Sequence, residues 1–256
     1  MKIPLRYQVS EYDCGPTSLL NALNYLFQRE EISPELIRNI MLYSLDCYGS
    51  GGAPGKRGTS RMAMMFLSNW LDGVGKTGIL PVESRYLSGR DVRMDAHSTL
   101  VDALHRNGVA VVRLYLDGEH YVLLTGEKEG RVYLFDPYYL PDGFAETEIE
   151  NATDHPFHYN HIVPFSYFNR ETQAPYALGS EAEREAVLLF DTRTKLTEEK
   201  PSSISFKQVF IICVSLIEYH LLIIQIIKQT GIGQNQADTG FPVFCASFSE
   251  SGWHMV

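Results

Sequence analysis

A cysteine at the predicted start of a helix is the residue in this sequence best placed to act as a nucleophile. Cys14 follows Asp13 and precedes a run of helix-forming residues. The unpaired N–H groups in the first turn of a helix stabilise negative charge, so a thiol at that position is favoured as the thiolate. Gln8 lies six residues earlier, and its amide can donate a hydrogen bond to an oxyanion beside the sulfur. Together these residues supply half of a cysteine hydrolase site.

A base and a carboxylate are expected on a β-hairpin further along the chain. Two runs rich in β-branched, aromatic and leucine residues flank a turn-like segment that ends in glycine. We expect the turn to be centred on Lys128 and Glu129. Asp136 then lies opposite His120 or Tyr121, where a carboxylate can fix the imidazole tautomer and stabilise the imidazolium. The chain order Gln, Cys, His, Asp is the set that a thiolate–imidazolium catalyst requires.

These motifs resemble the peptidases that remove double-glycine leaders from bacteriocin precursors, which belong to the papain-like cysteine peptidases. The resemblance covers about residues 5–140 and rests on Gln-x5-Cys-Gly, the histidine before an apolar strand, and the Asp-Pro after the hairpin. It implies that Gln8 is the oxyanion donor, Cys14 the nucleophile, His120 the general base and Asp136 the orienting carboxylate. Such leader peptidases usually precede a membrane exporter with an ATPase domain, whereas we expect a stand-alone peptidase here.

The elements that must position these residues are helices followed by strands. Residue periodicity and capping residues predict helices over 15–27, 34–45, 59–73 and 98–107, with Gly108 at the usual position past the last helix, and strands over 109–116, 121–125, 132–136 and 187–190. Helices first and an antiparallel sheet second define an α+β fold. The resemblance implies the papain-like arrangement, in which N-terminal helices pack on the sheet that carries the histidine and aspartate.

Two glycine-rich stretches do not have the pattern of a phosphate-binding loop. Residues 73–78 contain Gly-Lys-Thr, but Trp70 stands where the first glycine of such a loop is needed. Residues 49–58 have Arg57 where Ser or Thr is needed, and we expect them to form a flexible loop that borders the substrate cleft.

Three histidines, His155, His158 and His161, are close in sequence, yet they lie in a segment with a proline and aromatic residues. No cysteine is near enough to complete a zinc set. We therefore expect neither a metal nor a cofactor.

Composition narrows the class of protein. The chain has 256 residues, 45% of them hydrophobic and 21% charged, which is typical of a globular protein. The net charge of −9 argues against a nucleic-acid partner. The four cysteines (Cys14, Cys47, Cys213 and Cys245) form no CxxC pair, and the N-terminus lacks the apolar core of a secretory signal. We expect a cytoplasmic bacterial protein.

The composition changes near residue 200. We expect a peptidase domain over 1–199 and an apolar C-terminal tail over 200–256. Within the tail, residues 209–227 are almost wholly apolar, long enough to cross a bilayer, but Glu218 and His220 sit at the centre, where charge is costly. Three interpretations stay open: a buried helix or strand pair, a membrane anchor, or a segment foreign to the domain. Membrane association is not the favoured one.

The sequence thus predicts a cysteine peptidase that acts on a peptide or protein, with leader processing as the implied reaction. A second interpretation is an amidase or acyltransferase on the same triad. A third is an inactive peptide-binding module of the same fold. The presence of all four residues counts against the inactive module, because binding alone requires none of them.

Overall fold

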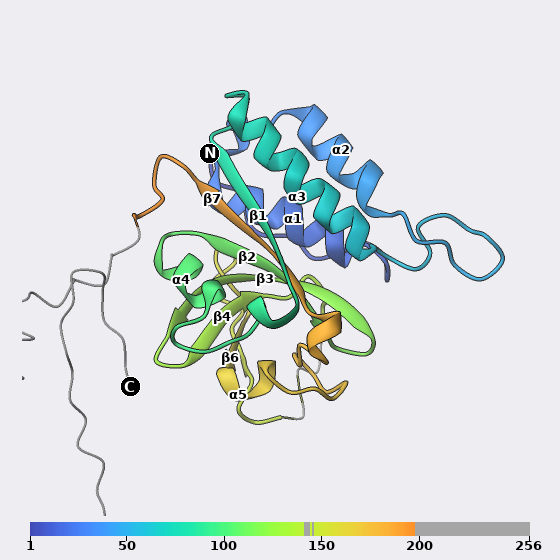
Figure 1. Ribbon diagram of the computed structural model, residues 1–256, viewed down its shortest axis with the longest axis vertical. Helices are drawn as coiled ribbons and strands as arrows, with labels where there is room; N and C mark the ends of the chain where they lie inside the picture. Colours follow the sequence, from blue (N-terminus) through green and yellow to red (C-terminus); the bar gives the residue numbers. More distant parts are fainter. Residues whose placement is uncertain (141–143, 145, 198–256) are drawn as a thin grey trace, which may run out of the picture. The chain divides into compact units, whose positions relative to one another are not determined.

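The computed structural model describes residues 1–140, 144 and 146–197 (Figure 1). The predicted tail over 200–256, its apolar run and two of the four cysteines lie outside the described residues. Among the described residues, no helix is both long enough and apolar enough to cross a membrane.

The N-terminal half is helical, as the capping pattern predicts. The helices are α1 (Cys14–Leu26), α2 (Pro34–Ser44), α3 (Arg61–Lys76), α4 (Thr99–His105) and the short α5 (Phe165–Phe168), with 3₁₀ turns η1 (Arg29–Glu31), η2 (Gly89–Asp91) and η3 (Glu181–Glu183). Serine hydroxyls cap three of them: Ser33 before α2, Ser60 before α3 and Ser98 before α4 each accept a backbone N–H three residues on. These caps set where the helices begin.

Two helix ends differ from the prediction. Helix α3 continues past 73 to Lys76, so the Gly-Lys-Thr stretch is the last turn of a helix and not a loop. After α4, the left-handed residue is Asn107 (φ 62°), not Gly108. Gly108 is required for space instead, because a Cβ there would lie 2.4 Å from the Phe190 ring. An asparagine tolerates the left-handed region, so it can end the helix in place of glycine.

The sheet has seven strands in the order β1-β7-β2-β3-β4-β6-β5, and every neighbouring pair is antiparallel. The strands are β1 (Val82–Ser88), β2 (Val109–Tyr115), β3 (Glu119–Lys128), β4 (Arg131–Phe135), β5 (Glu150–Asn151), β6 (His161–Pro164) and β7 (Glu185–Asp191). The sequence pattern indicated β2, β3, β4 and β7 but not β1, β5 or β6. Strand β7 lies between the edge strand β1 and β2, so a late segment of the chain joins β1 to the rest of the sheet.

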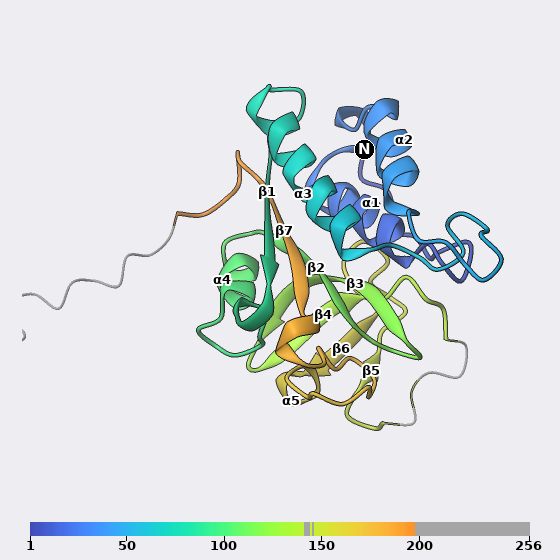
Figure 2. The same ribbon diagram turned by 45° about the vertical axis from the view of Figure 1, so that its right-hand side comes forward.

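Helices cover both faces of this sheet and create two hydrophobic cores. Helices α1 and α3 pack on one face with α2 packed against them, and α4 and α5 lie on the other face, as both views show (Figures 1 and 2). Strands β2 and β7 are buried along their whole length because both faces are covered. The fold is α+β and papain-like, as the sequence predicts.

The hairpin of β3 and β4, which carries His120 and ends just before Asp136, has a different strand register from the expected one. Its turn is centred on Glu129 and Gly130, both with positive φ, and Lys128 pairs with Arg131. An irregularity between Leu124 and Gly126 then shifts the ladder by one residue. The last pair is Leu123 with Phe135.

Continuing that register sets Asp136 against Val122, and not against His120 or Tyr121 as the sequence analysis supposed. His120 is then two positions further along β3, which makes it a diagonal neighbour of Asp136 within side-chain reach.

Two glycines of α3, Gly73 and Gly75, allow the packing of this helix on β1 to be tested. A Cβ on Gly75 would meet the Val82 carbonyl oxygen at 1.7 Å, whereas a Cβ on Gly73 has nothing within 4 Å. Gly75→Ala should lower the free energy of unfolding by about 1–3 kcal/mol, because the helix must move off the strand. Gly73→Ala should raise it by roughly 0.5–1 kcal/mol through helix propensity. Urea unfolding of both variants measures this, and equal effects would contradict the packing.

Candidate active site

Cys14 is the first residue of α1 and is nearly buried, with 7% of its surface exposed. The segment before it is folded by Asp13, whose carboxylate accepts hydrogen bonds from the backbone N–H of Val9 and from both the N–H and the hydroxyl of Ser10. Because Asp13 turns its side chain back into this loop, it makes no side-chain cap on the helix. The thiol therefore stands at a helix N-terminus without a competing carboxylate cap.

His120 and Asp136 form a buried hydrogen-bonded pair. The His120 Nε2 lies 2.7 Å from Asp136 Oδ1, and the carboxylate is fully buried. Burial by itself lowers the pKa of His120, but the charge and hydrogen bond of Asp136, together with Cys14, outweigh it and raise the pKa to about 10. With Nε2 on the carboxylate, Nδ1 is the ring nitrogen left for the thiol. The structure thus brings Cys14, His120 and Asp136 together.

The Asp136 carboxylate is held by groups on three sides. Its Oδ1 also accepts the backbone N–H of Tyr138 at 2.8 Å, and its Oδ2 accepts the hydroxyl of Tyr176 at 3.0 Å. The Asn160 side chain accepts from the Asp136 backbone N–H and donates to its carbonyl, each at 2.8 Å. These contacts fix the direction in which the carboxylate faces the imidazole.

Sequence reasoning missed Tyr176 and Asn160. They follow Asp136 by 40 and 24 residues. Tyr176 is fully buried and has a positive φ of 60°, which is uncommon for a tyrosine. Neither lies in a local motif, so no sequence signal short of the fold points to them.

Gln8 lines the same cleft as Cys14 and is hydrogen-bonded to the end of the hairpin. Its backbone N–H donates to the Pro137 carbonyl at 2.8 Å, which ties the loop before Cys14 to the Asp-Pro segment. Its side-chain Nε2 donates to the Ser10 carbonyl at 2.8 Å, and its buried Oε1 has no hydrogen-bond partner among the described residues. An amide nitrogen carries two hydrogens, so one N–H remains for a ligand in the cleft.

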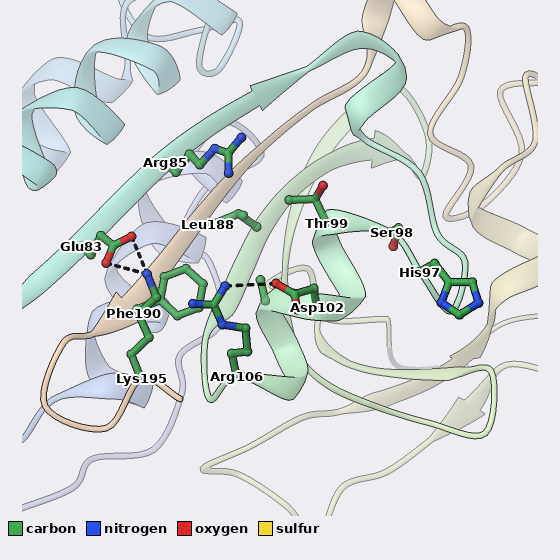
Figure 3. A pocket seen from close by; sticks show the side chains of 11 residues that line it. Glu83, Arg85, His97, Ser98, Thr99, Asp102, Arg106, Leu188, Phe190 and Lys195 are labelled. Carbon is green, nitrogen blue, oxygen red and sulfur yellow. Dashed lines mark hydrogen bonds and ion pairs between the residues drawn. The ribbon is translucent and has the colours of Figure 1, made fainter. Parts of the chain in front are cut away.

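Gln8, Cys14 and His120 line one cleft of about 390 Å³, which we call the Cys14 cleft. Its wall includes the carboxylates of Glu11, Asp117 and Glu119, and the aromatic and apolar side chains of Leu116, Tyr138, Leu140, Phe144 and Pro175. A separate cavity of about 420 Å³ lies between β1, β7 and α4 and has Arg85, Arg106 and Lys195 in its wall (Figure 3). That cavity shares no lining residue with the Cys14 cleft.

The three clustered histidines do not converge. His161 is buried in β6, where Nδ1 lies 2.7 Å from Asn160 Oδ1 and burial lowers its pKa. His155 and His158 lie in the loop before β6. No group of side chains in residues 1–140, 144 and 146–197 is arranged to hold a metal ion.

A helix-borne cysteine, a strand-borne histidine and a buried aspartate on an antiparallel sheet define the papain-like class of cysteine peptidases. The model of the Peptidase_C39 like family matches residues 1–162, and the chain belongs to this family. No curated protein matches the chain. Among solved structures, it is similar to a double glycine motif protease from an AMS/PCAT transporter, solved in complex with the leader peptide, with 13% identity, a TM-score of 0.35 and coverage of 74% of this chain and 90% of that one.

The protonation of His120 can be measured directly. The His120 ring should stay protonated through neutral pH and lose its proton near pH 10, in contrast to the ordinary value of 6.5. Asp136→Asn should lower the pKa of His120, because it removes the charge that outweighs burial. Glu127→Gln, which removes the carboxylate beside the exposed His105, is the matched control. The pKa of His120 in the unmodified protein and in both variants can be measured from the NMR chemical shifts of the histidine ring carbons. A His120 pKa near 6.5 in the unmodified protein would contradict its pairing with Asp136.

Tyr176→Phe tests the support of Asp136. The change removes the donor of a buried carboxylate oxygen without changing the shape of the core, so it should cost about 1–3 kcal/mol of unfolding free energy. Tyr167→Phe is the control, because its hydroxyl bonds to the exposed Glu148, where water can replace it. Urea unfolding should separate the two variants, and an equal, small loss in both would mean that Tyr176 does not hold Asp136.

Proposed function

We propose that this protein is a cysteine peptidase that cleaves a peptide bond with Cys14 as nucleophile. The observation that carries the proposal is the contact of His120 with a buried carboxylate on one side and with Cys14 on the other. That arrangement stabilises imidazolium beside thiolate, and the thiolate is the reactive form of cysteine.

In the proposed reaction the Cys14 sulfur attacks the carbonyl carbon of the scissile bond. Negative charge develops on the carbonyl oxygen, which accepts hydrogen bonds from the Gln8 side-chain N–H and the Cys14 backbone N–H. The His120 imidazolium then gives its proton to the leaving amine, and the C–N bond breaks to leave a thioester. Water, deprotonated by His120, hydrolyses the thioester and restores the thiol proton. Asp136 orients the imidazole throughout.

The substrate we propose is a peptide that carries a double-glycine leader. Family membership over residues 1–162 and the sequence motifs support this choice. The name of the similar solved structure, a double glycine motif protease, agrees with it, although that resemblance is distant. Peptides that contain Gly-Gly are therefore the first substrates to assay, with Gly-Ala and Ala-Ala analogues beside them.

Selective alkylation tests the nucleophile. Iodoacetamide at about pH 6 should modify Cys14 ahead of the other cysteines, because Cys14 stands at a helix N-terminus beside His120. Cys47 is the internal reference, since burial and Asp46 raise its pKa. The modified residues are identified by peptide mass spectrometry. Replacement of His120 by glutamine should remove the preference for Cys14, and faster labelling of Cys47 in the unmodified protein would overturn the assignment.

Turnover of a cleavable peptide tests the oxyanion donor. Gln8→Ala should raise the barrier by roughly 2–4 kcal/mol, the typical contribution of one such donor, with the fold unchanged. Gln173→Ala, at an exposed position in a loop, is the control and should keep full activity. If Gln8→Ala keeps full kcat, the oxyanion role belongs to another group.

A further inference from the structure

A second cavity, of about 590 Å³, adjoins the Cys14 cleft, and we call it the arginine cavity. Its wall includes three arginines and three glutamates, together with Tyr121: Arg57, Arg61, Arg113, Glu119, Glu183 and Glu185. Glu119 also lines the Cys14 cleft, so the two spaces share a wall residue.

The cavity also approaches the nucleophile from the side of helix α1. Thr59, another wall residue, packs so closely on Gly15 that a Cβ there would lie 2.3 Å from its Oγ1. Glu119 and Tyr121 flank His120 in sequence. A peptide bound at Cys14 therefore has this cavity within reach of its side chains.

The carboxylates at the inner wall are already satisfied. Glu185 is buried and accepts hydrogen bonds from the hydroxyls of Tyr86 and Tyr121, both at 2.7 Å. Arg113 lies 3.3 Å from Glu185 and also pairs with Glu119. The Glu183 carboxylate accepts hydrogen bonds from the backbone N–H and the hydroxyl of Ser180. Each carboxylate of the wall therefore already has donors within the protein.

The two outer arginines have no comparable partners. Arg61 is 41% exposed, and the Glu185 carboxylate is 4.0 Å from its Nε, at the limit of an ion pair. Within the part of the chain that the structure describes, Arg57 makes no hydrogen bond or ion pair. The Thr59 hydroxyl is buried and lacks a hydrogen-bond partner there. The cavity thus offers cationic and hydroxyl groups that its own carboxylates leave unused.

A guanidinium binds a carboxylate through two parallel hydrogen bonds, and it is the side chain best suited to that role. The wall has three arginines and three glutamates, and Arg57 and Arg61 are left for a ligand because the glutamates already have donors elsewhere in the protein. On the basis of the proposed peptidase function, we propose that the arginine cavity is a substrate subsite for an acidic side chain close to the scissile bond. Arg61 and Arg57 are the residues that bind it.

The test uses electrophiles that differ only in charge. Iodoacetyl-glutamate amide and iodoacetyl-glutamine amide both alkylate a thiolate, forming an S–C bond and releasing iodide. Versions with one or two glycine spacers vary the reach from the Cys14 sulfur to the arginines. Rates of Cys14 modification are measured by mass spectrometry on the full chain, and uncharged iodoacetamide is the reference reagent, because Cys47 itself lines the arginine cavity.

At one spacer length the glutamate reagent should modify Cys14 about tenfold faster than the glutamine reagent, the order expected for a charge-assisted hydrogen bond at a half-exposed site. Arg61→Gln should reduce the ratio of the glutamate rate to the glutamine rate severalfold. The double variant with both Arg61→Gln and Arg57→Gln should reduce this ratio further. Arg85→Gln, in the separate cavity of Figure 3, is the matched control and should leave the ratio unchanged. Thermal melting confirms that each variant is folded.

The possible outcomes distinguish failure of the subsite proposal from failure of the proposed peptidase function. If Cys14 reacts faster than Cys47 with iodoacetamide but the glutamate and glutamine reagents modify Cys14 at equal rates at every spacer length, the subsite is overturned and the peptidase proposal stands. A ratio that survives in the Arg61→Gln and Arg57→Gln double variant also overturns the subsite. If iodoacetamide does not modify Cys14 ahead of Cys47, the proposed function fails and the subsite fails with it.

Discussion

The buried carboxylate of Asp136 is the group on which the geometry of the site depends. A carboxylate removed from water is costly unless charge and hydrogen bonds compensate it, and a fully buried one must be satisfied by the protein. Asp136 meets this demand through His120, the Tyr138 backbone and Tyr176. The same contacts that stabilise the charge fix the imidazole plane. The same contacts therefore stabilise the fold and orient the candidate base.

The arrangement of the sheet explains how the thiol reaches this pair. Helix α1 packs on β3, the strand that carries His120, and the loop before the helix bonds to Pro137 at the end of the hairpin. The helix N-terminus and the strand end are held from both sides. A change in the hairpin would displace the imidazole, and a change in the 8–13 loop would displace the sulfur, because the two segments share these contacts.

Two neighbouring spaces near the nucleophile differ in their charged side chains. The described residues that line the Cys14 cleft include three carboxylates and neither lysine nor arginine, whereas three arginines and three glutamates line the arginine cavity. The arginine cavity depends on β7, because Glu185 pairs with Arg113 and accepts hydrogen bonds from two tyrosines. Residue 185 lies beyond the stretch matched by the family model, residues 1–162. The part of the chain outside that match thus shapes the wall of the arginine cavity.

The sequence by itself determined the parts that depend on short-range physics. Helix caps at Ser33, Ser60 and Ser98, the helical start at Cys14 and the hairpin before Asp136 follow from local hydrogen bonds and residue periodicity. The pairing of Asp136 with His120 was predicted, but from a wrong register, because the turn is centred one residue later than expected, on Glu129 and Gly130, and the irregularity near Gly126 offsets only part of that shift.

Only the tertiary structure decided the rest. Strand β7, late in the chain, pairs between β1 and β2, Tyr176 and Asn160 reach Asp136 across 40 and 24 residues, and Glu185 on β7 meets Arg113 on the neighbouring strand β2. Such contacts arise from long-range packing, in which a residue's partner depends on the path of the whole chain. A local pattern carries no information on that path, and so these supports appear only once the fold is known.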